Sequence, residues 1–266
     1  MKIAMLGHKR IPSREGGIEI VIEELASRMV DSGNNVTVYN RRGHHVSDSS
    51  YDINDNIKIY KGINIKSVIT INRKGLAAIS SSFFATCKVS FSNYDLIHFH
   101  AEGPCSMLWI SHLFNKKTVV TIHGLDWQRA KWKEGIGSKI IKFGERQAVK
   151  YADEIIVLSK EVHNYFLTTY NRQTNFIPNG VNKPNIIQAN EIKEKFQLDK
   201  DEYILFLGRL VPEKGIHYLI DAYSNLNTNK KLVIAGGTSD TDEYMKKLKT
   251  KSKKKQKYCI YRICSG

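Results

Sequence analysis

The sequence predicts an α/β protein with a doubly wound parallel sheet in a first domain and a second, smaller domain of the same class. Three observations support this prediction. Short apolar runs typical of buried strands alternate with amphipathic helical segments through residues 1–180. Another strand, a glycine turn and a helix follow within residues 203–226. The composition then changes after residue 249, so the second domain is expected to be incomplete.

The first unit of this pattern lies within the first 40 residues. Lys2–Leu6 is a short apolar strand, and residues 18–29 carry apolar side chains at helical spacing up to Gly33, which ends the helix. Val36–Tyr39 is the next strand. A strand, a helix and a strand in so short a stretch predict a parallel pair with a right-handed crossover.

The same alternation continues through the rest of the first domain. The expected elements are short strands within Ile57–Ile71, a helix at Leu76–Phe91, a strand at Asp95–His100, a helix at Pro104–Phe114, a strand at Thr118–Ile122, a helix at Lys139–Tyr151, a strand at Glu154–Leu158, a helix at Lys160–Tyr170 and a strand at Thr174–Ile177. We therefore expect a complete, Rossmann-like first domain over residues 1–180.

The second part of the chain is divided by its composition. Residues 181–202 are expected to connect the domains, residues 203–249 to form a partial second Rossmann-like domain, and residues 250–266 to form an atypical lysine-rich tail. A complete domain of this kind needs roughly 100 residues to cover both faces of its sheet. The expected elements are a strand at Tyr203–Leu207 that is buried on both faces, a helix at Ile216–Leu226, a strand at Leu232–Gly237 and a helix at Asp242–Leu248.

The composition and charge indicate a protein with anionic partners. The formal net charge is +15, and residues 251–266 supply six of these charges. The rest is distributed over residues 1–250, which favours nucleotide diphosphates, acidic membrane surfaces or nucleic acid. No apolar run reaches the roughly 20 residues of a membrane-spanning helix, and the start of the chain lacks a secretory signal, so we expect a cytoplasmic protein.

The stretch YILFLGRLVPEKG at residues 203–215 predicts a phosphate site. The strand ends at Gly208, and Arg209 and Lys214 precede the start of the next helix. Backbone amides and the positive end of the helix dipole attract phosphate there. An arginine fork and a mobile lysine could hold a diphosphate together. The alternative is an ordinary loop whose two cations face water.

A second candidate loop lies after the first strand. Gly16 and Gly17 precede a helix, and paired glycines allow backbone amides to approach a phosphate or sugar oxygen. This loop does not match a dinucleotide fingerprint, because the next glycine lies nine residues after Gly7. The second strand also ends in Tyr39-Asn40, without the acid that holds the ribose of NAD.

Polar residues also follow two neighbouring strands of the first domain. Glu102 comes after one strand, and His123, Asp126 and Trp127 come after the next. Ligands bind at the carboxyl ends of parallel strands, so these side chains could contact a sugar. Purely structural roles are the alternative.

A metal site is a further possibility, suggested by the pairs His44-His45 and His98-x-His100. No carboxylate completes a recognisable ligand set, so no metal is expected.

Together these segments resemble the family-four glycosyltransferases of the GT-B fold, and most closely a bacterial subgroup that attaches rhamnose and related sugars to surface polysaccharides. The matching segments are GHKRIPSREGGIE, TIHGLDW, VLSKEVHNYF, FIPNGV and LGRLVPEKGIHYLIDAY, so the resemblance reaches to about residue 249.

The resemblance implies a retaining, metal-independent transfer of a sugar from a nucleotide diphosphate donor to a saccharide or lipid-linked acceptor, with no cofactor. Arg209 and Lys214 would hold the donor diphosphate, Gly16 and Gly17 would approach the phosphate or the acceptor, and His123 would contact the transferred sugar.

The sequence also departs from the family. The glutamate motif that binds the donor sugar is not found, and the resemblance ends before the lysine-rich tail. The sequence therefore predicts a truncated glycosyltransferase, located in the cytoplasm or peripherally at the inner face of the membrane. The alternatives are an NAD-dependent epimerase or dehydrogenase, which the missing fingerprint disfavours, and a non-catalytic basic protein that binds anionic lipid, nucleotide or nucleic acid.

Overall fold

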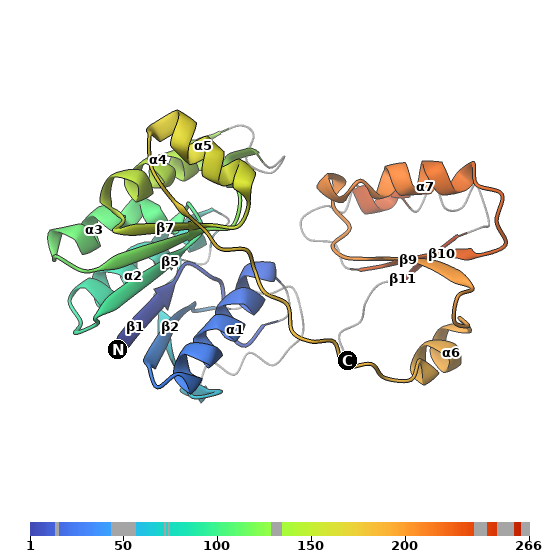
Figure 1. Ribbon diagram of the computed structural model, residues 1–266, viewed down its shortest axis with the longest axis horizontal. Coiled ribbons are helices and arrows are strands. Elements are labelled where there is room, and N and C mark those ends of the chain that lie inside the picture. Colours follow the sequence, from blue (N-terminus) through green and yellow to red (C-terminus); the bar gives the residue numbers. More distant parts are fainter. Residues whose placement is uncertain are drawn as a thin grey trace. The chain divides into compact units, whose positions relative to one another are not determined.

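The chain forms two compact units, residues 1–181 and 182–266 (Figure 1). The computed structural model describes residues 1–13, 16–43, 57–71, 73, 75–128, 135–236, 244–248 and 258–261.

An eight-stranded sheet forms the centre of the first unit. Its strands are β1 (Lys2–Leu6), β2 (Asn35–Arg41), β3 (Ile59–Tyr60), β4 (Ile63–Val68), β5 (Leu96–His100), β6 (Thr118–Ile122), β7 (Glu154–Val157) and β8 (Asn175–Phe176). Their order in the sheet is β3-β4-β2-β1-β5-β6-β7-β8, and every pair is parallel except the β3–β4 hairpin. The predicted doubly wound α/β fold is therefore confirmed.

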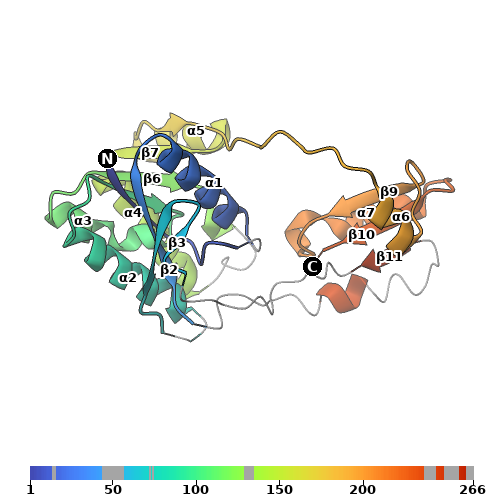
Figure 2. The same ribbon diagram turned by 90° about the horizontal axis from the view of Figure 1, so that it is seen from below.

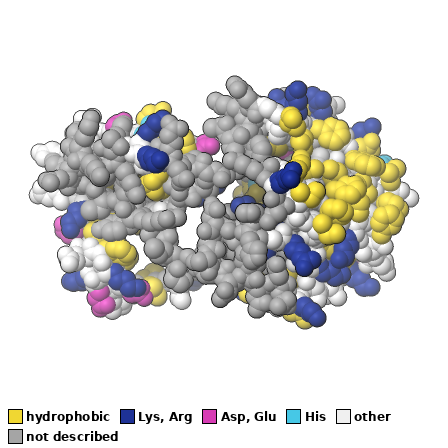
Figure 3. Space-filling view, turned by 180° about the vertical axis from the view of Figure 1, so that it is seen from behind, with side chains coloured by type: hydrophobic (Ala, Val, Ile, Leu, Met, Phe, Trp, Pro, Cys, Tyr) yellow, Lys and Arg dark blue, Asp and Glu magenta, His cyan; other side chains and the backbone are white. Residues whose placement is uncertain are grey.

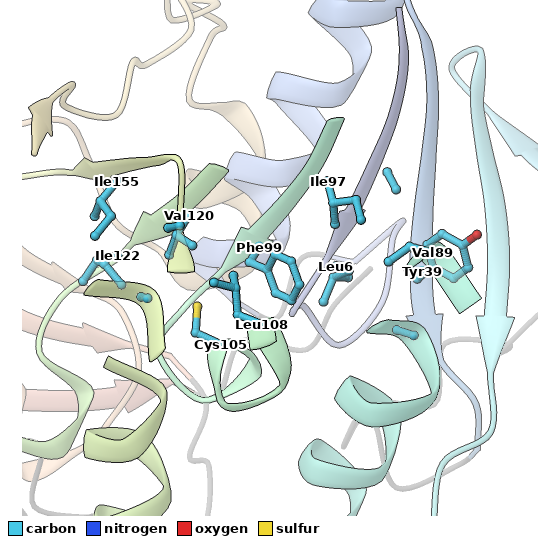
Figure 4. Packing of buried hydrophobic residues seen from close by; sticks show 14 of the residues in the cluster. Leu6, Tyr39, Val89, Ile97, Phe99, Cys105, Leu108, Val120, Ile122 and Ile155 are labelled. Atoms are coloured by element: carbon cyan, nitrogen blue, oxygen red, sulfur yellow. The ribbon is translucent and has the colours of Figure 1, made fainter. Parts of the chain in front are cut away.

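Helices cover both faces of this sheet (Figures 1 and 2). They are α1 (Gly17–Asp31), α2 (Leu76–Ser90), α3 (Leu108–Leu113), α4 (Ile136–Tyr151) and α5 (Lys160–Tyr170). Side chains alternate between faces along a strand. Ile3 and Met5 of β1 accordingly pack against α1, while Ala4 and Leu6 belong to the cluster that contains α2, α3 and α4 side chains. Figure 4 shows part of this second cluster, in which Phe99 lies near Leu6 and Leu108.

The starts of two helices in the first unit differ from the predicted ones. The helix expected at Pro104–Phe114 begins as a 3₁₀ turn at Pro104–Met107 and becomes α3 only at Leu108. The helix expected from Lys139 starts three residues earlier, at Ile136, after Gly135 with a φ of 100°. A left-handed glycine before a helix is difficult to place from a sequence, because its neighbours carry no periodic signal.

The second unit contains a three-stranded parallel sheet in the order β11-β10-β9. Its elements are α6 (Asn190–Phe196), β9 (Tyr203–Leu207), α7 (Ile216–Ser224), β10 (Lys231–Ala235) and β11 (Tyr258–Tyr261). Residues 244–248 are also helical. The core of this unit lies between the sheet, α7 and residues 244–248.

One prediction for this sheet is wrong. Strand β9 is not buried on both faces, because Leu205 and Leu207 are 50% and 66% exposed. Ile204 and Phe206 point to the other face and pack into the core with α7. In the described residues, the helical cover of β9 lies on that face alone.

The predicted tail falls partly outside the described residues, which leave out 249–257 and 262–266. Four residues within it, Tyr258–Tyr261, form strand β11 and pair in parallel with β10. The pattern of that segment did not predict a strand.

No helix in the described part of the chain is both long and apolar enough to cross a bilayer.

Candidate functional site

The candidate site of the first unit lies where the central parallel strands end. Strands β1, β5, β6 and β7 are neighbours and run in the same direction, so their carboxyl ends share one edge of the sheet. The residues that follow β5 and β6, namely Glu102, His123, Asp126 and Trp127, are brought together there, as the sequence predicted.

His123 is half-buried and contacts a buried histidine of the neighbouring strand. Its Nε2 atom lies 3.1 Å from Nδ1 of His100, and the two rings stack with centroids 5.4 Å apart. His100 lies in turn against His98, whose Nε2 is 2.8 Å from Oγ1 of Thr121. Burial lowers the pKa of His98 to about 3 and that of His100 well below its ordinary value, so both rings are neutral.

The contact with His100 also indicates which nitrogen of His123 carries the proton. Nε2 of His100 is buried and has no hydrogen-bond partner among the described residues. A proton at that position would be an unsatisfied buried donor, so the favoured tautomer of His100 carries its proton on Nδ1. That nitrogen then donates to Nε2 of His123, whose own proton is on Nδ1.

Glu102 does not face solvent, contrary to the expectation that it accepts hydrogen bonds from sugar hydroxyls. Its side chain is fully buried, and Oε2 accepts a hydrogen bond from the backbone amide of Asp126 at 2.9 Å. Burial, together with the nearby carboxyl groups of Glu145 and Asp126, raises the pKa of Glu102 to about 10. The buried carboxyl group therefore fixes the loop that carries Asp126 rather than contacting a ligand.

Glu145 of α4 completes this support, and the sequence analysis did not identify it. Oε2 accepts from Nε1 of Trp127 at 3.1 Å, and Oε1 accepts from the hydroxyl groups of Tyr165, at 2.9 Å, and Tyr170. A signal for Glu145 exists in the sequence, since it lies on the same helical face as Ile141 and Ala148 and is buried with them.

Trp127 and Asp126 form the outer part of the site. Both are half-buried, and the indole ring of Trp127 lies under the ammonium group of Lys142, 4.5 Å from the ring centroid. The hydrogen bond from Trp127 to Glu145 fixes the orientation of the ring. A flat ring held in this way can support the apolar face of a sugar, so the predicted contact with a sugar stays a prediction.

Gly16 and Gly17 lie at the start of α1, with Gly16 at the N-cap. The carboxylate of Glu19 occupies the space beside Gly16, so a Cβ atom at Gly16 would overlap with Oε2 of Glu19. Oε1 of Glu19 accepts from the backbone amide of Lys9 at 3.0 Å, which ties the loop after β1 to this helix. An anionic group already lies at this helix N-terminus, whereas the space around Gly17 is open.

The loop after β1 is fixed by Asn40 of β2. Its Oδ1 accepts from the backbone amide of Ile11 at 3.0 Å and lies 2.9 Å from Nε2 of His8, while its Nδ2 donates to the Ile11 carbonyl at 2.8 Å. In the sequence, Asn40 is notable only because it ends the second strand where a dinucleotide site would carry the acid that holds the ribose of NAD. In the structure, Asn40 positions the backbone that leads to Gly16.

Arg209 and Lys214 belong to the second unit, and both side chains are exposed. Arg209 follows Gly208 at the end of β9, and Lys214 ends a 3₁₀ turn before Gly215, whose φ of 66° leads into α7. Neither side chain forms an ion pair with another described residue. The backbones at the ends of β9 and β10 approach each other closely here. A Cβ atom at Gly236 would therefore overlap with the carbonyl oxygen of Gly208.

No cluster of three or more His, Cys, Asp or Glu side chains suited to a metal occurs among the described residues. His44 and His45 lie outside them. Metal independence stays a prediction.

Comparison with known proteins places this geometry in a family. The family model "Glycosyltransferase Family 4" matches residues 15–183, and the model "Glycosyl transferases group 1" matches residues 188–261. The uncharacterized glycosyltransferase MJ1178 of Methanocaldococcus jannaschii is 27% identical over 222 residues, which are 82% of this chain and 56% of that protein. The alpha-maltose-1-phosphate synthase of Mycolicibacterium smegmatis is 23% identical over 259 residues, covering 91% of this chain and 62% of that protein. The chain thus spans about three fifths of these relatives.

Solved structures show the same fold. Anabaena Alr3699/HepE in complex with UDP and glucose superimposes with a TM-score of 0.74 at 16% identity, covering 100% of this chain and 70% of that one. Sucrose-phosphate synthase from Thermosynechococcus elongatus gives a TM-score of 0.74 at 18% identity, covering 99% of this chain and 71% of that one. The predicted GT-B-type fold is confirmed by these matches.

Proposed function

The chain belongs to glycosyltransferase family 4, and from this membership we propose that it transfers a sugar from a nucleotide diphosphate donor to a saccharide or lipid-linked acceptor. The resemblance implies that the transferred sugar is a rhamnose-like sugar or another hexose. It also implies that the transfer retains the anomeric configuration and needs no metal or cofactor. Alr3699/HepE has been solved with UDP and with UDP-glucose, which supports a nucleotide-sugar donor here.

The observation that carries this proposal is the loop at the end of β9. It presents two exposed cations, Arg209 and Lys214, directly before the N-terminus of a nine-residue helix. A nucleoside diphosphate leaves with growing negative charge as the glycosidic bond breaks. Two cations and a helix N-terminus stabilise such charge, which supports their assignment to the donor diphosphate.

In the first unit we assign the sugar-facing roles to three residues. His123 contacts the transferred sugar, while Asp126 accepts from a sugar hydroxyl and Trp127 supports the ring. Glu102 and Glu145 act behind them by fixing the loop. Gly16 and Gly17 remain candidates for approach to the phosphate or acceptor, with Gly17 in the open position.

The test measures nucleotide binding by titration calorimetry with UDP, GDP, ADP and dTDP in turn. We expect Arg209→Gln and Lys214→Gln each to weaken the binding of the preferred nucleotide by about 10- to 100-fold, because each removes charge-assisted hydrogen bonds worth about 1.5–3 kcal/mol.

The matched control is Lys231→Gln, an exposed lysine at the opposite end of the same sheet. Unchanged affinity in the two loop variants, with circular dichroism showing an intact fold, would refute the assignment. An equal loss in the control would indicate only a general charge effect.

Two further parts of the proposal need their own measurements. Turnover by the 266-residue chain with candidate sugar nucleotides tests the proposed sugar transfer. A cytoplasmic location, peripheral at the inner face of the membrane, fits a lipid-linked acceptor and is tested by the binding of the protein to lipid vesicles.

A further inference from the structure

Helix α2 has its polar and apolar faces reversed relative to an ordinary surface helix. Its buried residues include Ser80, Ser81, Ser82, Thr86 and Ser90. Its outward residues include Leu76, Phe83 and Phe84, which are 44%, 42% and 36% exposed. A helix on a water-exposed surface normally turns its apolar stripe inward. The reversal indicates that the outer face of α2 has an apolar environment of its own.

The buried serines in the first half of α2 do not require a partner outside the helix. Oγ of Ser80 donates to the Leu76 carbonyl at 2.8 Å, and Oγ of Ser82 donates to the Ala78 carbonyl at 2.7 Å. Each hydroxyl is thereby satisfied within its own helix, and its small size allows close packing against the sheet. The sequence of α2 can therefore place phenylalanines outward with these serines inside, while Oγ1 of Thr86 is buried without a hydrogen-bond partner among the described residues.

The exposed apolar surface continues from α2 onto α3. Oγ of Ser90 and Oγ of Ser111 lie 3.0 Å apart, so the two helices touch through small residues. Just beyond the helix ends, the rings of Phe91 and Phe114 have centroids 4.4 Å apart. Leu113 of α3 is 67% exposed beside them. We call this surface the α2–α3 apolar face, formed by Leu76, Phe83, Phe84, Phe91, Leu113 and Phe114; yellow side chains gather on the first unit in Figure 3.

A basic strip lies next to this face on α4. Helix α4 packs against α3, with the ring of His112 4.7 Å from that of Tyr151. The exposed charged residues of α4 are all cationic: Lys139, Lys142, Arg146 and Lys150. The described residues of α2 and α3 contain no acid, and the one acid of α4, Glu145, is buried. The surface thus combines exposed aromatic side chains with unopposed positive charge.

We propose that the α2–α3 apolar face and the α4 basic strip form a docking surface for an anionic lipid bilayer. Apolar and aromatic side chains enter the interface, and the cations meet acidic headgroups. A second copy of the chain fits less well, because a two-fold contact through this face would bring two basic strips together with no exposed acid on α2, α3 or α4 to offset them. The inference deepens the proposed function, since a lipid-linked acceptor would be met at this surface.

Vesicle binding tests the docking surface without nucleotide or acceptor, so its outcome is independent of whether the chain transfers a sugar. The protein is mixed with vesicles of 30% phosphatidylglycerol in phosphatidylcholine, or of phosphatidylcholine alone, and bound protein is measured by sedimentation. We expect binding to the anionic vesicles, at least ten-fold weaker binding to the neutral ones, and a blue shift in fluorescence from the exposed Trp109 of α3.

Two variants identify the surface that binds. The double variant Phe83→Gln/Phe84→Gln is expected to lower the apparent lipid affinity at least ten-fold, and Lys139→Gln/Arg146→Gln is expected to lower it selectively for anionic vesicles. The matched control, Ile20→Gln, alters an apolar residue of α1 on the opposite face of the sheet that is also 41% exposed. All variants retain the lysine-rich residues 251–257, so vesicle binding through that segment would be the same in each.

Several results would overturn the proposal. These are a failure of the wild-type chain to bind anionic vesicles, equal binding to neutral vesicles, or an unchanged affinity in the phenylalanine variant. Analytical ultracentrifugation gives a further decisive outcome: a wild-type dimer that the Phe83/Phe84 variant converts to a monomer, without vesicle binding, would assign the face to self-association. Circular dichroism confirms that each variant is folded, which is expected because the altered side chains are exposed.

Discussion

The carboxyl group of Glu102 is protonated across the physiological range. Burial and the neighbouring carboxyl groups raise its pKa to about 10, compared with an ordinary value near 4.5. The native state therefore retains a proton that the unfolded chain releases above about pH 4.5. The stabilisation from this group is complete below that pH and is lost as the pH rises toward 10, by at most about 1.4 kcal/mol per pH unit.

The buried histidines have the opposite effect. Burial lowers the pKa of His8 to about 4 and that of His98 to about 3, and the pKa of His100 is also well below 6.5. The unfolded chain binds protons at these positions below about pH 6.5, whereas the native state does not. Stability is therefore lost as the pH falls from 6.5 toward 4, and the first unit is expected to be most stable near pH 6.5.

The variant Glu102→Gln separates the two effects. We expect it to flatten the decline of stability between pH 7 and pH 9, because glutamine has no proton to release. On the acid side it should steepen the loss of stability between pH 6.5 and pH 4.5, where the Glu102 contribution otherwise opposes that of the histidines. Urea unfolding followed by tryptophan fluorescence measures this, since Trp109, Trp127 and Trp132 all lie in the first unit. An unaltered alkaline decline would show that Glu102 is ionised in the native protein.

At the scale of the element, α4 is held close to the turn that follows β5. Gly144 lies where a Cβ atom would overlap with the carbonyl oxygen of Glu102, and this close approach brings Glu145 behind the site loop. Gly144→Ala should therefore destabilise the first unit by about 2 kcal/mol or more, despite the better helix propensity of alanine.

The matched control for Gly144→Ala is Gly103→Ala. Gly103 has a φ of −54°, and the space around its Cβ position is open, so we expect a change within about 0.5 kcal/mol. Urea midpoints from tryptophan fluorescence compare the two variants. Equal stability of Gly144→Ala and the parent chain would mean that α4 can move away from the turn.

Sequence periodicity identified most elements because burial follows it in ordinary helices and strands. In α1, for example, Ile22 and Ala26 are buried as their spacing predicts. The buried face of α2 and the burial of Glu102 could not be predicted from periodicity, for physical reasons. The inward hydroxyl groups of Ser80 and Ser82 in α2 are satisfied by their own helix, so hydropathy does not reveal which face is buried. Likewise, Glu102 reads as an exposed acid in the sequence, and only its contact with the Asp126 amide shows that it is internal.

At the scale of the whole molecule, the sequence indicated two domains because each contains its own strand and helix pattern. Each unit has a separate core: Leu6, Phe99 and Ile122 lie in the first, and Ile216 and Leu232 lie in the second. The roles of Arg209, Lys214 and His123 stay predictions, because they depend on ligands rather than on packing. The chain between the units has no regular structure from residue 177 to residue 189.

This connecting segment should be the first site of proteolysis by thermolysin. The enzyme cleaves before large apolar residues in accessible, extended chain, and Val181, Ile186 and Ile187 are 95%, 95% and 82% exposed. We expect mass spectrometry to show an early fragment that ends at residue 180, 185 or 186. The variant Val181→Ser/Ile186→Ser/Ile187→Ser should slow this cut, because it removes the preferred residues without altering either core.

The cleaved first unit should keep its urea midpoint by tryptophan fluorescence, because its sheet and both of its apolar clusters lie within residues 1–181. A first cut within the eight-stranded sheet would contradict the division into units. A free energy of unfolding that falls by more than about 1 kcal/mol after cleavage would show instead that the second unit stabilises the first, and the two could then not be treated as independently folded parts.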